Sequence, residues 1–183
     1  MADYTKVMIV SDTHGQIDPH IAQMSQQVDF VLHCGDIGDA HVLGALQPRR
    51  RVHVITGNND TPARAPSQDL PLLANLSETL SLDLPGGVLL AVHGHRQVPA
   101  SKRHQILRRL YPDVRCIAYG HSHRLLIDDA DTPQIVNPGA AGRDRTHGGP
   151  SCLILDASKD RWYYSRHRFP LRPVRRRSVT NNR

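Results

Sequence analysis

Short runs of β-branched and aliphatic residues, each ended by a polar turn, recur along the first third of the chain. Three such runs are typical of strands, at residues 6–11, 30–34 and 52–55. Apolar positions recur near helical spacing after Pro19, and a shorter helical pattern covers residues 41–46. This alternation of strands and helices predicts a parallel sheet built from βαβ units.

The pattern changes twice in the middle of the chain. Residues 61–71 hold three prolines, so we expect an irregular surface loop that forms a rim or lid after the third strand. Residues 79–84 alternate polar and apolar positions, and a Pro-Gly-Gly turn joins them to the apolar run 88–93. This arrangement predicts a β-hairpin and not another crossover helix.

The second half of the chain is mostly strand after one helix. Residues 101–110 have a basic amphipathic pattern, which predicts a helix with Ile106, Leu107 and Leu110 facing inward. Strand patterns joined only by turns follow, at residues 116–119, 125–128, 134–136, 151–155 and 162–169. A parallel half followed by a strand-rich half predicts an α/β fold with two packed sheets between helices, an α/β/β/α sandwich. In sheets of this kind, sites lie beyond the carboxyl ends of the strands.

The positive charge of the chain is concentrated at one end. The net charge is +6, yet residues 170–183 hold five arginines and no acid, which leaves +1 for residues 1–169. An apolar content of 39% is enough for one core, so we expect one domain over residues 1–169. Residues 170–183 are typical of a flexible, solvated basic tail, and a nucleic-acid contact is the less favoured alternative.

The cysteines and the apolar runs indicate in which cellular compartment the protein is expected. Cys34, Cys116 and Cys152 are far apart and form no C-x-x-C pair, which indicates buried thiols and neither a disulfide framework nor a thiolate zinc site. No signal-peptide pattern opens the sequence, and no apolar run approaches the ~20 residues that cross a bilayer. We therefore expect a cytoplasmic protein without a membrane partner.

Five short polar motifs at or near the ends of predicted strands carry side chains that can bind metals. They are Asp12-Thr13-His14, Gly35-Asp36, Gly57-Asn58-Asn59-Asp60, His93-Gly94-His95 and Gly120-His121-Ser122-His123. A single Asp, Gly-Asp or Gly-Asn motif is ordinarily a turn or a helix cap. A pair of histidines two residues apart after an apolar strand, present twice here, is hard to explain as core packing, because buried imidazoles need partners.

The five motifs together indicate a metal centre. Carboxylate, amide and imidazole ligands without thiolate suit Mn, Fe, Ni, Co or Zn. The number of ligands exceeds what one ion needs, so we expect two divalent ions roughly 3.5–4 Å apart with a shared carboxylate between them. Among the remaining histidines, His33 is the best candidate to support the ligands, and the others are expected to be surface or packing residues.

The order D-x-H, G-D, G-N-x-D, H-G-H, G-H-x-H resembles the calcineurin-like metallophosphoesterases, in particular the small single-domain phosphodiesterases of bacteria and archaea. The match spans residues 12–139 and includes Asn137-Pro138-Gly139 near its end. The resemblance implies a metallophosphoesterase-type sandwich that hydrolyses phosphate esters with two metal ions, with manganese favoured. It also implies a hydroxide between the ions as the nucleophile.

The resemblance also assigns roles to residues of this chain. Asp12, His14 and His123 would hold one ion, and Asn58, His93 and His121 the other. Asp36 would bridge the ions, and Asn58 and His95 would donate hydrogen bonds to the substrate, so that Asp36, Asn58 and His95 are the expected catalytic residues.

One position departs from the family pattern. Asn59 stands where larger relatives have a histidine thought to assist the leaving group, and where the small group often has cysteine. Arg143 and Arg145 lie in a loop that loosely resembles a family loop, and either phosphate contacts or solvated residues fit them.

Two other functions stay open beside a phosphodiesterase. One is a non-catalytic interaction module on the same fold, like the retromer subunit in this group. The other is a nuclease that uses the basic tail to hold nucleic acid. A homo-oligomer is compatible with either.

Overall fold

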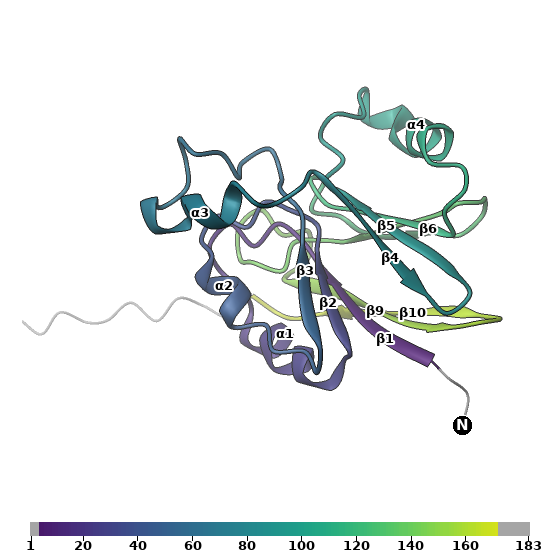
Figure 1. The fold of residues 1–183 in the computed structure, drawn as a ribbon, viewed down its shortest axis with the longest axis horizontal. Helices are drawn as coiled ribbons and strands as arrows, with labels where there is room; N and C mark the ends of the chain where they lie inside the picture. Colours follow the sequence, from purple (N-terminus) through teal and green to yellow (C-terminus); the bar gives the residue numbers. More distant parts are fainter. Residues whose placement is uncertain (1–3, 172–183) are drawn as a thin grey trace, which may run out of the picture.

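The strands form two five-stranded sheets in the computed structural model, which describes residues 4–171 (Figure 1). The first sheet has the order β10-β9-β1-β2-β3 and the second the order β4-β5-β6-β8-β7. The first contains β1 (Tyr4–Val10), β2 (Phe30–His33), β3 (Arg51–Val54), β9 (Ser151–Ser158) and β10 (Trp162–Arg168). The second contains β4 (Thr79–Leu84), β5 (Gly87–Val92), β6 (Cys116–Tyr119), β7 (Leu125–Asp128) and β8 (Gln134–Pro138).

The strand pairings confirm the predicted parallel unit and the predicted hairpin. Strands β1, β2 and β3 are parallel neighbours, and β4 pairs antiparallel with β5. The two last strands return to the first sheet: β9 pairs antiparallel with β1, on the side away from β2, and β10 pairs antiparallel with β9. In the second sheet β5, β6 and β8 are parallel neighbours. The first sheet is therefore parallel from β1 to the β3 edge and antiparallel on the side of β9 and β10, whereas the second has a parallel centre and an antiparallel strand at each edge.

Three apolar clusters show why four layers form. Val7 and Ile9 face the core between the sheets, whereas Met8 and Val10 face the other way and pack with Ile21. This alternation has the period of two that a strand buried on both faces requires. Figure 1 shows α1 (Pro19–Met24) and α2 (His41–Gly44) beside the first sheet and α4 (Arg103–Leu110) beyond the second. The predicted α/β/β/α sandwich is thus confirmed.

Four short helical turns lie in the connecting segments. They are η1 (Ser25–Gln27), η2 (Ser67–Asp69), α3 (Leu70–Leu73) and η3 (Ala100–Lys102). The expectation of an irregular loop over residues 61–71 was wrong in part, because η2 and the start of α3 lie within it. Pro71 occupies an early position of α3, where its missing N–H has no intrahelical partner and its fixed φ suits a helix.

One residue of α4 does not face inward as predicted. Leu107 is fully buried against the second sheet, but Leu110 is 54% exposed. The helix ends at Leu110, and the chain then turns so that Tyr111 and Val114 pack against the cluster instead. The amphipathic pattern identified the buried face of the helix, while the length of the helix decided which leucine is covered.

This difference predicts unequal effects of two similar substitutions. Leu107→Ala is expected to lower the free energy of unfolding by about 2–5 kcal/mol, because it leaves a cavity in a closed cluster. Leu110→Ala is expected to change it by less than about 0.5 kcal/mol, because the side chain is already largely solvated. Urea unfolding of both variants measures the difference, and equal losses would contradict the packing of α4.

The remaining predictions about the chain as a whole have separate outcomes. All three cysteines are free and buried, as expected, and burial raises the pKa of Cys116 and Cys152 to about 12. Almost all of the predicted basic tail, residues 172–183, lies outside the described residues. Within residues 4–171, no helix combines the length and apolar character that a bilayer span requires.

Candidate metal centre

The predicted ligands lie at one edge of the two sheets, where the parallel strands end. They come from the ends of five strands: Asp12 and His14 after β1, Asp36 after β2, Asn58 after β3, His93 after β5, and His121 and His123 after β6. Neighbouring parallel strands end at the same edge, so residues distant in sequence become neighbours there. Strand order therefore explains why one site can draw on five separate motifs.

The backbone at these ligands is unusual. Within residues 4–171, six residues other than glycine have a positive φ, and five of them are predicted ligands: Asp12 at 54°, His14 at 46°, Asp36 at 57°, His121 at 63° and His123 at 57°. The left-handed conformation costs a side chain about 1–2 kcal/mol relative to the right-handed one. Such strain persists where the surrounding structure holds it, often at functional sites.

One group of ligand atoms consists of His14, His123 and Asp12. The Nε2 atoms of His14 and His123 lie 3.3 Å apart, and His123 Nε2 lies 3.3 Å from Asp12 Oδ1. Asp12 is fully buried, and its Oδ2 atom has no hydrogen-bond partner within the described chain. A buried carboxylate oxygen without a partner is costly, so this geometry calls for a cation beside Asp12.

A second group consists of His93, Asp36 and Asn58. His93 Nδ1 donates a hydrogen bond to the carbonyl oxygen of Cys34 at 2.8 Å, which directs the Nε2 lone pair into the site. That Nε2 atom lies 3.4 Å from Asp36 Oδ1 and 3.2 Å from Asn58 Oδ1. A nitrogen lone pair and two oxygens thus face one another, and only a proton or a metal cation can satisfy all three.

Asp36 connects the two groups. Its Oδ1 faces His93, and its Oδ2 lies 3.9 Å from His14 Nε2. Asn59 binds the same carboxylate twice, through its backbone N–H to Oδ1 at 2.8 Å and through Nδ2 to Oδ2 at 2.6 Å. Burial alone raises the pKa of Asp36, but the hydrogen bonds from His93 and Asn59 hold that pKa well below its usual value. The carboxylate is therefore available as an anion between the two groups.

The pKa values of the two histidines facing the carboxylates reflect this charge. Burial is the largest single influence on the pKa of His93 and lowers it, but the hydrogen bond and charge of Asp36, with the charge of Asp12 and the hydrogen bond to Cys34, together raise that pKa above its usual value. Burial also lowers the pKa of His123, but its hydrogen bond with Asp12 and the charge of that carboxylate, with a backbone hydrogen bond to Asp144, raise that pKa above its usual value. A proton thus takes up the attraction that a metal ion would satisfy. The donor set of carboxylate, imidazole and amide fits a divalent transition metal.

His121 and His95 lie at the border of this arrangement. The His121 ring centroid is 5.4 Å from that of His93, and its backbone N–H donates to Asp12 Oδ1 at 3.2 Å. The two compact groups of His, Asp, Glu or Cys ligand atoms in the described residues are Asp12 with His14 and His123, and Asp12 with Asp36 and His93. His95 stands 5.5 Å from His93 between ring centroids, and its buried Nδ1 has no partner in the described chain. His121, a predicted ligand, therefore lies outside both compact groups, and His95, a predicted substrate contact, lies beside His93 at the border of the centre.

His33 supports the loops that carry the ligands. Its Nδ1 accepts a hydrogen bond from the N–H of Gly35 at 3.2 Å, and its Nε2 lies 2.9 Å from Thr13 Oγ1, which donates to the carbonyl of Ile37. Burial lowers the pKa of His33 to about 4, so the ring is neutral at physiological pH. A neutral ring can accept at one nitrogen and donate at the other, which joins the Asp12 and Asp36 loops.

Substitution of His33 is therefore expected to weaken metal binding without removing a ligand. His33→Leu fills a similar volume but leaves the Gly35 N–H and the Thr13 hydroxyl without this partner, and we expect a ~10- to 100-fold rise in the metal dissociation constant. Metal titration monitored by calorimetry measures this change. His53→Leu, on the neighbouring strand and away from these loops, is the control. Equal affinity in the wild type and in His33→Leu would exclude the supporting role.

Arg145 makes a contact with the predicted ligand His14 that the sequence motifs alone could not establish. Its Nη2 donates a hydrogen bond to His14 Nε2 at 2.9 Å, and Arg145 itself has a positive φ of 52°. Of the two arginines singled out in this loop, only Arg145 touches a predicted ligand within the described residues. A guanidinium beside the ligands is well placed to meet an anionic group above the centre.

Comparison with known proteins identifies the family. Residues 5–160 match the family model of the calcineurin-like phosphoesterase superfamily domain. A phosphodiesterase of Methanocaldococcus jannaschii is 27% identical over 163 residues, which cover 84% of this chain and 94% of that protein.

Solved structures show the same fold at lower identity. A single mutant of Vps29 from Entamoeba histolytica aligns with a TM-score of 0.70 at 20% identity, covering 90% of this chain and 99% of that one. Wild-type Vps29 from the same organism, complexed with Zn²⁺, aligns with a TM-score of 0.66 at 20% identity, covering 89% and 98%. With the family match over most of its length and the ligand groups at the strand ends, the chain belongs to the calcineurin-like phosphoesterase superfamily.

Proposed function

We propose that this protein is a dinuclear metal-dependent phosphodiesterase. The observation that carries the proposal is the position of Asp36, whose two carboxylate oxygens face one ligand group each. A carboxylate placed in this way can neutralise two cations at once, and such pairs of ions are typical of enzymes that hydrolyse phosphate esters. The 27% identity to an archaeal phosphodiesterase supports the same activity.

The ligands divide between two ions in this proposal. Asp12, His14 and His123 would hold one ion, and Asn58, His93 and His121 would hold the other, with Asp36 between them. Two such ions would lower the pKa of the attacking water and offset the negative charge of the phosphoryl oxygens. Manganese is the favoured metal, and nickel, iron, cobalt or zinc would suit the same ligands.

The protein itself orients the ester. His95 borders the centre on the side of β5, where a hollow of about 70 Å³ is lined by His93, His95 and Arg96. Asn58 lies on the other side of His93, with its Oδ1 atom 3.2 Å from His93 Nε2. The His95 ring is only partly buried beside His93, so it can donate a hydrogen bond to a substrate oxygen at the border of the centre. His95 and Asn58 therefore hold the ester while Asp36 fixes the charge beneath it.

The test is a metal-reconstituted assay with the full chain. Protein freed of metal is loaded separately with Mn²⁺, Ni²⁺, Fe²⁺, Co²⁺ or Zn²⁺ and assayed against phosphomonoesters, aryl phosphodiesters, cyclic nucleotides and oligonucleotides. We expect two ions per chain and metal-dependent turnover of phosphodiesters. One ion per chain, or no turnover with any metal, would reject the proposal.

Asn59 leads to a prediction about the preferred ester. Its carboxamide cannot release a proton to a leaving group near neutral pH and so cannot act as a general acid. Its Nδ2 also already donates a hydrogen bond to Asp36. Because general-acid help contributes ~10²- to 10⁴-fold, alkyl monoesters with poor leaving groups should suffer most from its absence. We expect kcat/KM for an aryl phosphodiester to exceed that for the matching aryl monoester by at least ~10-fold. A parent enzyme that prefers alkyl monoesters would contradict this reasoning.

The likeness to Vps29 favours one alternative, a non-catalytic interaction module on the same fold. Such a module has no need for metal-dependent turnover, so the assay above separates the two functions. A nuclease that uses the basic tail is a third reading, and it predicts activity confined to oligonucleotides with steep salt dependence.

A further inference from the structure

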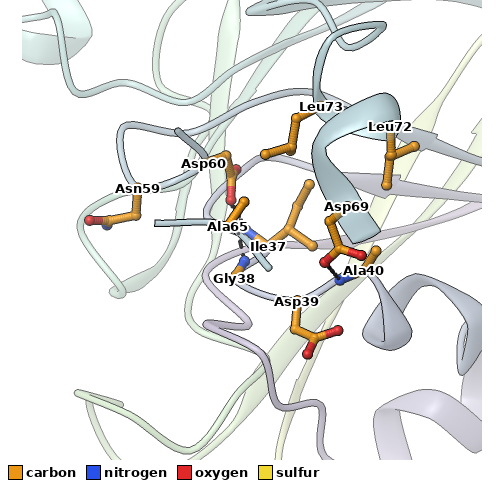
Figure 2. Close-up of a pocket in the computed structure, with 10 residues that line it drawn as sticks. All are labelled: Ile37, Gly38, Asp39, Ala40, Asn59, Asp60, Ala65, Asp69, Leu72 and Leu73. Carbon is orange, nitrogen blue, oxygen red and sulfur yellow. Dashed lines mark hydrogen bonds between the residues drawn. The ribbon is translucent and has the colours of Figure 1, made fainter. Parts of the chain in front are cut away.

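The segment after the Gly57-Asn58-Asn59-Asp60 motif is fixed to the ligand loop of β2 at its beginning. Asp60 Oδ1 accepts hydrogen bonds from the N–H groups of Ile37 at 2.8 Å and Gly38 at 3.2 Å, as Figure 2 shows. Its Oδ2 accepts from the N–H of Gly57 at 2.7 Å. One carboxylate thus joins the loops that carry Asp36 and Asn58, and it orients the residues that follow.

The same segment is fixed again at its other end. Asp69 is 8% exposed, and its Oδ2 accepts a hydrogen bond from the N–H of Ala40 at 2.8 Å. Figure 2 shows Leu72 and Leu73 of α3 near Ile37, on the same side as Asp69. With both ends bound to residues 37–40, the intervening residues 61–68 form a fixed rim, of which Arg64 and Pro66 border a cleft beside His14.

Arg64 projects from this rim onto Asn59. The turn that carries it is closed by hydrogen bonds from the N–H groups of Arg64 and Ala65 to the carbonyl of Thr61. The Arg64 Nη1 donates to Asn59 Oδ1, while Asn59 Nδ2 donates to Asp36. Asn59 therefore links the guanidinium to the carboxylate between the two ligand groups.

An open cleft of about 370 Å³ lies beside this link, bordered by His14, Asp39, Asn59 and Arg64. Apart from the predicted ligand His14, the polar side chains among the described residues that line it are a carboxylate, a carboxamide and a guanidinium. A guanidinium stays protonated at physiological pH, and a carboxamide does not release a proton. A leaving group beside Arg64 consequently meets a positive charge but no side chain that releases a proton.

We propose that Arg64 determines specificity by binding a phosphate in the leaving group, so that the preferred substrates are diesters of pyrophosphate, such as nucleoside diphosphate esters. This inference rests on the proposed phosphodiesterase activity and names its substrate class. Water attacks one phosphorus and forms a P–O bond, the P–O bond to the bridging oxygen breaks, and its electron pair leaves with the second phosphate. The proton lost by water passes to solvent, and the leaving phosphate needs none.

The chemistry of arginine fits this role better than that of a general acid. Its planar fork carries five N–H donors, of which the contact with Asn59 uses one, and the others match two oxygens of a phosphate. Asn59 fixes the fork, so little side-chain freedom is lost on binding. A phenolate leaving group has one oxygen and no fork to match, and it therefore gains less from Arg64.

Two substrates that release the same product test this directly. Uridine diphosphate glucose and the 4-nitrophenyl ester of uridine 5′-monophosphate both yield uridine monophosphate, but only the first expels a phosphate. In Arg64→Ala we expect kcat/KM to fall ~10- to 100-fold for the first and less than ~3-fold for the second, the loss typical of charged hydrogen bonds. Arg64→Lys, which keeps the charge without the fork, should recover only part of the loss. Arg49→Ala, an exposed arginine at the opposite end of β3 paired with Asp29, is the matched control.

The result that overturns the proposal is an equal loss for both substrates or no loss for either, with metal content and thermal unfolding unchanged. A binding measurement separates this outcome from failure of the phosphodiesterase itself. If the metal-loaded wild type turns over neither substrate, the activity is wrong, and calorimetry with the α,β-methylene analogue of uridine diphosphate still tests Arg64. A ~10-fold weaker affinity for that analogue in Arg64→Ala, with uridine monophosphate unaffected, would support the phosphate contact, and unchanged affinity would reject it.

Discussion

Asp36→Asn is expected to reduce hydrolysis at least ~10³-fold and to lower the amount of bound metal. A carboxylate between two divalent ions supplies several kcal/mol of charge stabilisation, which a carboxamide of the same shape cannot replace. The substitution also places an NH₂ group or a neutral oxygen opposite Asn59 Nδ2, which now donates to Asp36 Oδ2 at 2.6 Å. Charge and hydrogen bonding are thus both disturbed at the point where the two ligand groups meet.

The measurement is kcat/KM for an aryl phosphodiester together with the number of metal ions per chain. Asp83→Asn, at an exposed position of β4, makes the same chemical change away from the strand ends and should leave both values unchanged. Two ions per chain with full activity in Asp36→Asn would show that the carboxylate does not bridge the centre.

Gly57→Ala is expected to lower kcat/KM ~10²-fold, although glycine contributes no ligand atom. A Cβ at this position would lie 2.2 Å from Asp36 Oδ1 and 2.3 Å from the backbone nitrogen of Asp36. Neither atom can move away without displacing the carboxylate, because both belong to the loop that Asp60 and Asn59 hold in place. A displacement of about 1 Å at a reacting centre typically costs ~10²-fold in rate.

Gly44→Ala is the matched control for this prediction. A Cβ at Gly44, in α2, meets no atom within 4 Å, so we expect unchanged activity and a gain in stability of at most about 1 kcal/mol. The activity of both variants, their metal content and their urea unfolding distinguish displacement of Asp36 from general destabilisation. Normal metal affinity and normal turnover in Gly57→Ala would mean that the Asp36 loop tolerates the shift.

The sequence by itself determined most of the elements of this fold. The period of two in β1 and the apolar face of α4 depend on the chemistry of neighbouring residues, which is local and can be read along the chain. The polar residues that follow the strands could also be identified along the chain, and the parallel arrangement indicated where they would meet. Parallel strands end at a common edge, so motifs such as Asp12-Thr13-His14 and Gly120-His121-Ser122-His123 could be expected to meet there.

Only the tertiary structure decided which atoms meet and at what distance. The pairing of Asp12 with His123 joins residues 111 positions apart in sequence and depends on how the two sheets pack. The role of Arg64 is another example, because an exposed arginine in a proline-rich segment has no local pattern that marks it. It faces the cleft because Asp60 and Asp69 fix the segment at both ends, and those bonds exist only once residues 37–40 are folded beneath it. Local chemistry thus set the elements and the ligands, whereas long-range packing set the partner of each side chain.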